Sequence, residues 1–114
     1  MFKTFVMAVA VIFVMTASSF AHPPQAVEIE FDKEAGALTA TVSHAVSDPA
    51  SHYIFKIVMK VNGETIEEQE LEGQDDEAGL IYETIIEGLN AGDTVEFIAF
   101  CNKGGELGAS YIVP

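Results

Sequence analysis

The strongest constraint on the fold is an alternation of apolar and polar residues with a period of two, interrupted at short intervals by turn-forming residues. In Ala37–Ser43 (ALTATVS), for example, Leu38, Ala40 and Val42 share one face and the threonines share the other. Such alternation is typical of half-buried β-strands, because successive side chains of a strand point to opposite faces. No segment after residue 21 has the apolar spacing of an amphipathic helix.

The alternation predicts seven short strands. The third is apolar on both faces, which is typical of a central strand, and Asn62-Gly63 after it predicts a tight hairpin. The fourth is polar and acidic, which predicts an edge strand. The expected strands are Ala26–Phe31, Ala37–Ser43, Tyr53–Val61, Glu64–Leu71, Leu80–Ile86, Thr94–Phe100 and Leu107–Val113. Their number and spacing favour an all-β fold, an immunoglobulin-like antiparallel β-sandwich.

Residues 1–21 (MFKTFVMAVAVIFVMTASSFA) have the parts of a secretory signal peptide. Lys3 precedes an apolar run, Phe5–Met15, that is too short to span a bilayer as a helix. Small residues at Ser19 and Ala21 suit signal peptidase, so we expect cleavage after Ala21 and a periplasmic or secreted protein. An uncleaved N-terminal anchor is the alternative, and the shortness of the apolar run disfavours it.

Residues 22–114 would then form one small domain, with a formal charge close to the −13 of the whole chain. A surface this acidic repels nucleic acid and anionic lipid. We therefore expect no nucleic-acid partner, and no stable membrane insertion after cleavage.

Three histidines and a single cysteine stand beside the expected strands. They are His22, His44, His52 and Cys101. Strand ends of a sandwich gather at two poles, so all four side chains can meet at one of them. Imidazole and thiolate together suit zinc, copper or iron. The alternatives to a metal site are histidines that are merely solvated and a cysteine that is a small, buried apolar residue. A single cysteine excludes a disulfide within the chain but not one between chains.

Three segments resemble the iron-binding domain of superoxide reductases, the desulfoferrodoxin and neelaredoxin family. HPPQAVEIE is similar to the family's first histidine segment, SHAVSDPASHYIFKI to its paired-histidine loop, and AFCNKGGELG to its Cys-Asn-x-His-Gly motif. They come in the family's order and span almost the whole of residues 22–114. The resemblance implies an immunoglobulin-like fold and a mononuclear, non-haem iron held by four histidines and an axial cysteine thiolate.

Carried over residue by residue, the resemblance implies the metal ligands His22, His44, His52 and Cys101, with Cys101 as the axial thiolate. The family's fourth histidine is missing, because Gly104 stands in its place, and Gly104-Gly105 predicts a hairpin turn. The family's lysine before the first histidine is also missing, since Ala21 occupies that position. Lys103 is a further candidate for catalytic support through its positive charge, and the alternative is a solvated loop lysine.

Cleavage after Ala21 would create another candidate ligand, the α-amino group of His22. An N-terminal histidine that chelates through its amine and its imidazole is a histidine brace, which favours copper. Pro23 has no backbone N–H, which excludes further coordination through the second amide. The resemblance implies iron as the cofactor, and the possible brace makes copper the alternative. Replacement of the nitrogen lost at Gly104 by the amine is a hypothesis, and the alternative is that His22 comes first only because the signal peptide ends there.

With iron, the resemblance implies an oxidoreductase that reduces superoxide to hydrogen peroxide, with an electron donor that the sequence does not identify. The missing histidine and lysine favour a different class, a non-catalytic protein. That protein would be a periplasmic carrier of copper or iron, or an immunoglobulin-like binding module with a degenerate site. The sequence leaves both classes open.

Overall fold

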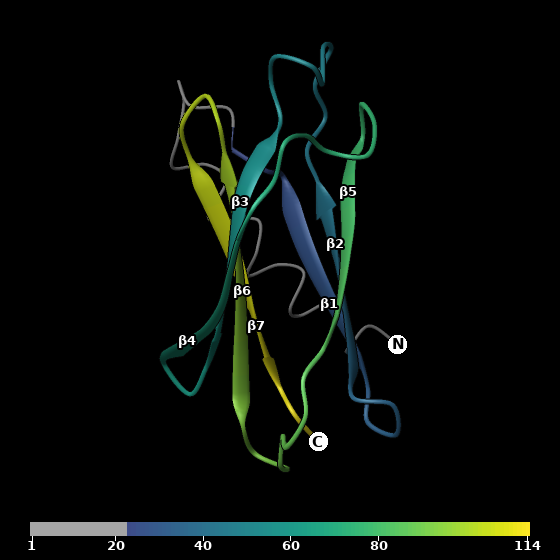
Figure 1. The fold of residues 1–114 in the computed structure, drawn as a ribbon, viewed down its shortest axis with the longest axis vertical. Coiled ribbons are helices and arrows are strands. Elements are labelled where there is room, and N and C mark those ends of the chain that lie inside the picture. The colour runs from purple at the N-terminus through teal and green to yellow at the C-terminus, as the bar shows by residue number, and fades with distance from the viewer. Residues whose placement is uncertain (1–22) are drawn as a thin grey trace, which may run out of the picture.

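The computed structural model describes residues 23–114, which contain seven strands and no helix (Figure 1). The strands are β1 (Ala26–Asp32), β2 (Ala37–Ser43), β3 (Ile54–Val61), β4 (Glu64–Glu70), β5 (Gly79–Ile85), β6 (Thr94–Cys101) and β7 (Glu106–Ile112). Every expected strand is present, and its ends lie within one residue of the expected ones. The expected signal peptide, its cleavage site and His22 lie outside the described residues. Within residues 23–114, no helix is long and apolar enough to cross a lipid bilayer.

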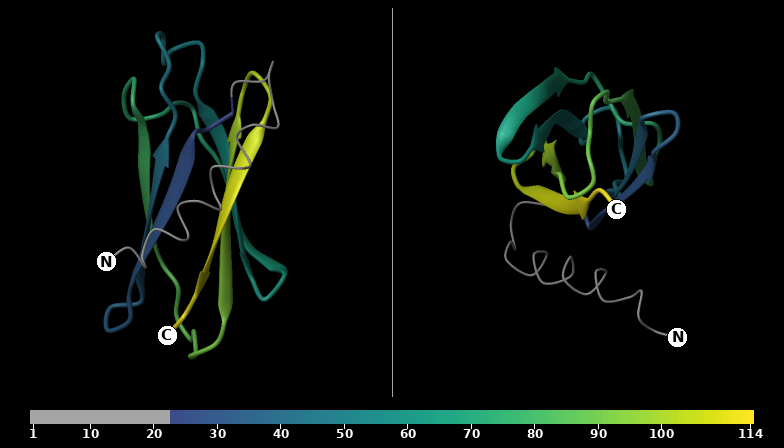
Figure 2. Two further views of the ribbon diagram at one scale, coloured as in Figure 1. Left: turned by 180° about the vertical axis from the view of Figure 1, so that it is seen from behind. Right: turned by 90° about the horizontal axis from the view of Figure 1, so that it is seen from below.

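The strands form two antiparallel sheets that face each other (Figure 2). One sheet has the order β1-β2-β5 and the other the order β4-β3-β6-β7. The expected all-β sandwich is confirmed, with β3 inside its sheet and β4 at an edge. At one side of the sandwich β1 lies beside β7, so the first and last strands close that side (Figure 2).

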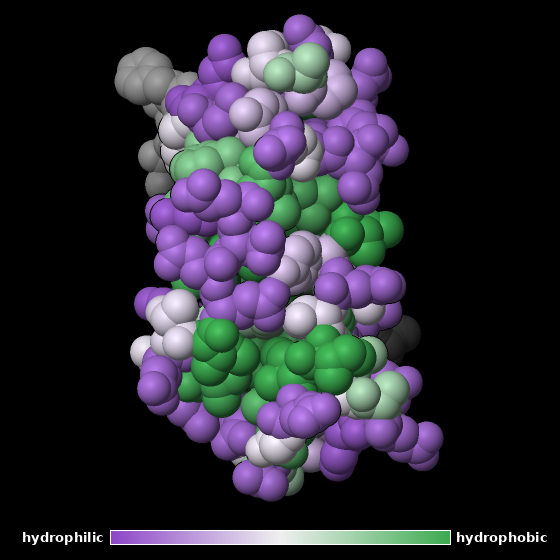
Figure 3. All heavy atoms as spheres, viewed as in Figure 1, coloured by the Kyte–Doolittle hydropathy of each residue, from purple (hydrophilic) through white to green (hydrophobic). Residues whose placement is uncertain are grey.

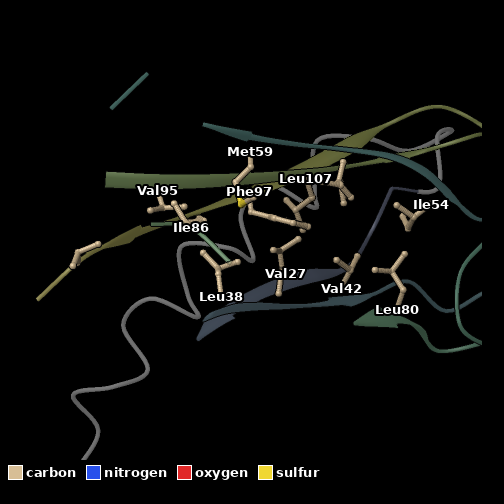
Figure 4. Close-up of a cluster of buried hydrophobic side chains, with 14 residues drawn as sticks. Val27, Leu38, Val42, Ile54, Met59, Leu80, Ile86, Val95, Phe97 and Leu107 are labelled. Atoms are coloured by element: carbon tan, nitrogen blue, oxygen red, sulfur yellow. The ribbon is translucent and has the colours of Figure 1, made fainter. Parts of the chain in front are cut away.

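The inward-facing apolar side chains fill the space between the sheets (Figure 4). The largest contributions of the three-stranded sheet are Val27, Leu38, Val42 and Leu80, and those of the four-stranded sheet are Ile54, Ile57, Met59, Val95, Phe97 and Leu107. On β2 the alternation is the expected one, since Leu38, Ala40 and Val42 are buried and the threonines between them are half-buried. Hydrophilic residues cover much of the face seen in Figure 3, with apolar residues exposed in patches between them.

Strand β3 departs from strict alternation near its start. Ile54 and Ile57 are both fully buried, although an odd spacing should place them on opposite faces. The pairing of β3 with β6 shifts register between Ile54 and Lys56, and this β-bulge lets both isoleucines face the core. The same pairing sets Ile54 opposite Cys101 at the end of β6.

Three connections gather at one pole, at the upper end of Figure 1. They are the segment between β2 and β3, the loop between β4 and β5, and the hairpin between β6 and β7. Gly104 and Gly105 have φ values of 110° and 93° in that hairpin, so the expected glycine turn is confirmed. The C-terminus lies at the opposite end of the molecule (Figure 1).

Candidate metal centre

The alternation of two strands carries His44 and Cys101 into the interior at this pole. Val42 is the last inward-facing residue of β2, and His44 follows two positions later and is fully buried. Ala99 is buried in β6, and Cys101 follows two positions later and is 3% exposed. Both polar side chains thus continue the core faces of their strands, one from each sheet.

The half-buried His52 completes the group from the turn that precedes β3. Its backbone N–H donates to the carbonyl of Asp48 at 2.9 Å, which closes that turn. The rings of His44 and His52 meet edge to face, with centroids 4.9 Å apart and planes at 83°. One ligand atom from each of His44, His52 and Cys101 lies within 4.8 Å of the other two. The structure therefore brings together three of the four residues that the sequence singles out.

The three donors fit a single metal ion. Bonds of about 2.0–2.3 Å from nitrogen and sulfur place ligand atoms about 3–4.5 Å apart around one ion. The observed group needs only a small contraction to reach that range. Two imidazoles and a thiolate are ligands that zinc, copper and iron accept. Metal ligation by these residues, and by His22, stays a prediction.

Asn102 ties the His52 turn to the end of β6. Its Oδ1 accepts the backbone N–H of Tyr53 at 2.9 Å, and its Nδ2 donates to the carbonyl of Ser51 at 3.1 Å. Its own backbone N–H donates to the carbonyl of Tyr53 at 3.0 Å. These bonds fix the backbone on both sides of His52 to the residue after Cys101.

Gln74, in the loop between β4 and β5, contacts the ring of His44. Its Oε1 lies 2.8 Å from Nδ1 of His44. Sequence reasoning missed this residue, because a glutamine in an acidic loop has no pattern that marks it. Only the fold brings it beside a histidine thirty positions earlier in the chain.

Burial raises the pKa of the Cys101 thiol above its ordinary value. The backbone N–H groups of Lys103 and Gly104 and the charge of Lys103 offset this in part. The N–H of Lys103 donates to Sγ at 3.3 Å, whereas Lys103 itself is exposed. A buried thiol with a raised pKa keeps its proton at neutral pH until a cation stabilises the thiolate. A role for the Lys103 side chain in catalysis stays a prediction.

The backbone at Gly104, where the family's fourth histidine would stand, has a conformation that favours glycine. Gly104 has a φ of 110°, which residues with a Cβ rarely adopt. Its N–H donates to the carbonyl of Cys101 at 3.0 Å, and the N–H of Cys101 donates to the carbonyl of Gly105 at 2.9 Å. In this hairpin a histidine at residue 104 would therefore be strained.

No protein-family model matches the chain, and no curated protein matches it. Among solved structures, the chain is similar to superoxide reductase (neelaredoxin) from Ignicoccus hospitalis, with a TM-score of 0.52 and 16% sequence identity. The similarity covers 89% of this chain and 86% of the other. At this identity it shows the fold alone. The chain therefore has a neelaredoxin-type β-sandwich fold, with two histidines and a cysteine brought together at one pole.

Proposed function

We propose that this chain is an exported, mononuclear metal-binding domain related to the superoxide reductases, acting in the periplasm or outside the cell. The convergence of His44, His52 and Cys101 within 4.8 Å carries the proposal. The likeness in fold to a superoxide reductase favours iron as the metal. His22, at the start of the cleaved chain, is the proposed fourth protein ligand.

In this proposal each described ligand has a separate role. His44 and His52 offer neutral imidazole nitrogens, and Cys101 offers a thiolate that gives electron density to the metal. The N–H of Lys103 stabilises that thiolate by a hydrogen bond to Sγ. Bound ferrous iron would supply the one electron, and water the two protons, that convert superoxide to hydrogen peroxide. A separate electron donor would then return the ferric iron to the ferrous state.

Elemental analysis and a visible spectrum test this function. The protein should be purified without oxygen and without a tag at His22, after natural export and cleavage. We expect about one iron per chain and a thiolate absorption band, because a ferric thiolate absorbs visible light. Cys101→Ser should abolish the band, whereas the control Lys103→Ala keeps the thiolate and the backbone donor and should retain it. A colourless wild-type protein without iron would refute the proposal.

A metal carrier is the second candidate, and the charge around His44 favours it. The backbone N–H groups of His44 and Val46 donate to the carbonyls of Ala78 and Glu77 at 2.8 and 2.9 Å. Because of this pairing, the acidic segment 75–77 lies beside the backbone of residues 44–46. A shallow hollow of about 460 Å³ beside it is lined by Pro49, Asp76, Glu77 and Ala78. Negative potential of this kind attracts metal cations and repels an anion such as superoxide.

Superoxide consumption by the iron-loaded protein separates the two candidates. A reductase should consume superoxide far faster than an equal amount of iron-loaded Cys101→Ser protein, and a carrier should not.

A second comparison tests the α-amino group of His22 with copper and with a protein that retains Ala21. If the α-amino group of His22 is a ligand, the additional residue should weaken copper binding. Equal copper affinity would exclude the amine.

A further inference from the structure

We propose that Gln74 selects the nitrogen of His44 that is available to a metal, by holding the ring proton on Nδ1 and leaving the lone pair on Nε2. The metal part of this inference rests on the proposed function. The assignment of the proton does not, because it follows from contacts within the protein.

The amide of Gln74 uses all of its hydrogen-bonding capacity at this pole. Its Oε1 accepts the backbone N–H of Ile54 at 3.1 Å and lies 2.8 Å from Nδ1 of His44. Its Nε2 donates to the carbonyl of His44 at 3.0 Å and to the carbonyl of Asp76 at 2.9 Å. An amide has two acceptor sites and two donor hydrogens, so these four contacts saturate it.

The backbone partners determine which way round the amide lies. The N–H of Ile54 can only donate, and the carbonyls of His44 and Asp76 can only accept. A flipped amide would set a donor against a donor and its oxygen against two carbonyl oxygens. The atom beside Nδ1 of His44 is therefore an oxygen, which accepts. Nδ1 must then be the donor, and in a neutral imidazole the proton on Nδ1 leaves Nε2 as the metal-binding nitrogen.

Burial makes this selection effective. His44 is fully buried and Gln74 is half-buried, so bulk water does not readily replace the amide. The four bonds also join three segments: the end of β2 at His44, the start of β3 at Ile54, and the acidic loop at Asp76. Gln74 thus orients the ring before any metal arrives, and it acts as a positioning residue.

Long-range ¹⁵N–¹H NMR of the histidine rings in the metal-free protein tests the assignment. Wild-type His44 should show a protonated Nδ1 and an unprotonated Nε2. Gln74→Ala should lose this single pattern, and the control Gln69→Ala, at an exposed position of edge strand β4, should keep it. A proton on Nε2 of His44 in the wild type, or an unchanged pattern in Gln74→Ala, would overturn the inference.

A second variant separates proton placement from folding of the loop. Gln74→Glu keeps an acceptor for Nδ1 of His44 but loses both donations to carbonyls. It should therefore keep the proton on Nδ1 of His44 even if the loop is destabilised. Loss of the Nδ1 proton in a folded Gln74→Glu protein would overturn the inference.

Zinc binding provides the metal readout. Groups that hydrogen-bond to a ligating histidine typically change metal affinity 10–100-fold, so Gln74→Ala should weaken zinc binding by about that factor and Gln69→Ala should not. Unchanged zinc affinity in Gln74→Ala would overturn the metal part of the inference. If wild-type protein binds neither zinc nor iron, the proposed function fails, while the NMR pattern still decides where the proton lies.

Discussion

Replacing Gly79 by alanine should destabilise the protein by about 2–6 kcal/mol and displace the backbone of His44. Gly79 begins β5 and pairs with Ser43 at the end of β2. A Cβ built on it would lie 1.9 Å from the carbonyl oxygen of Val42 and 2.9 Å from the nitrogen of His44. The two strands approach each other here more closely than any side chain allows.

The magnitude follows from two separate costs. Gly79 has a φ of 140°, and holding a residue with a Cβ in such a region costs about 1–3 kcal/mol. Carbon–oxygen contacts normally lie at about 3.3–3.6 Å, so the strands must also separate by roughly 1.4 Å or more. That separation weakens the bonds from His44 to Ala78 and from Val46 to Glu77, at about 0.5–1.5 kcal/mol each.

Two other glycines provide matched controls for urea denaturation. Gly88 has a φ of 83° but open space around it, so Gly88→Ala isolates the conformational cost, about 1–2 kcal/mol. Gly73 has open space and no positive φ, so Gly73→Ala should be neutral or slightly stabilising. For a domain of this size each kcal/mol corresponds to about 4–8 °C in Tm, so thermal unfolding should show the same order.

The reasoning fails if Gly79→Ala loses no more stability than Gly88→Ala. That result would mean that the strands separate at no cost, and that the close approach does not determine the position of His44. A second check is zinc affinity, which should fall in Gly79→Ala and stay unchanged in Gly88→Ala and Gly73→Ala.

Three further predictions concern the core, the seam between the sheets and the His52 turn. Phe97→Ala, at a fully buried position, should cost about 3–5 kcal/mol in urea denaturation, and a loss below about 1 kcal/mol would contradict the assigned core. The pKa of Tyr82 is raised to about 12, against about 10 in the unfolded chain. The main cause is burial, followed by the hydrogen bond to Glu67 and the negative charge of Glu67. The folded state therefore holds this proton more tightly, and its contribution to stability should be complete below about pH 10 and be lost as the pH rises toward about 12. Tyr82→Phe should flatten that part of the curve of stability against pH, and an unchanged curve would refute the assignment. Asn102→Ala should weaken zinc binding about 10–100-fold, with the exposed Asn90→Ala as the control, and equal affinities would show that Asn102 does not position His52.

Most of the fold could be predicted because period two is a local property of the chain. The β2 strand shows this, since its alternating residues and their burial agree at every position. Following the same period one residue past the end of β2 places His44 inward, and following it to the last residue of β6 places Cys101 inward. These placements need no knowledge of the rest of the chain.

The β4 strand shows where the pattern misleads. Ile66 is 46% exposed, whereas Glu67 is half-buried and accepts hydrogen bonds from the hydroxyls of Tyr82 and Thr84. The pairing with β3 shifts register here, so that Glu67 and Thr65 face successive residues of β3 and Ile66 is left over. A bulge is a property of two paired strands, and a single strand's sequence does not reveal it.

The residues of the candidate site also fall into two groups: those that the sequence identifies and those that only the fold reveals. Residue type and strand ends identify its histidines and its cysteine, because imidazole and thiolate are rare in this chain and chemically distinctive. Gln74 and the hydrogen bonds of Asn102 depend on segments distant in sequence that the fold brings together. Hydrogen-bonding partners of this kind can be recognised only when the sheets are in place.

The distribution of the site along the chain has a consequence for the order of folding. Its donors come from residues 44, 52 and 101, so its geometry requires both sheets and the last hairpin. Contacts between such distant positions form late, because the chain loses the entropy of closing long loops before it gains their energy. A nascent chain that has not yet reached β6 lacks the thiol altogether. Metal uptake would therefore be among the last events of maturation, and a bound ion would mark a molecule that has finished folding.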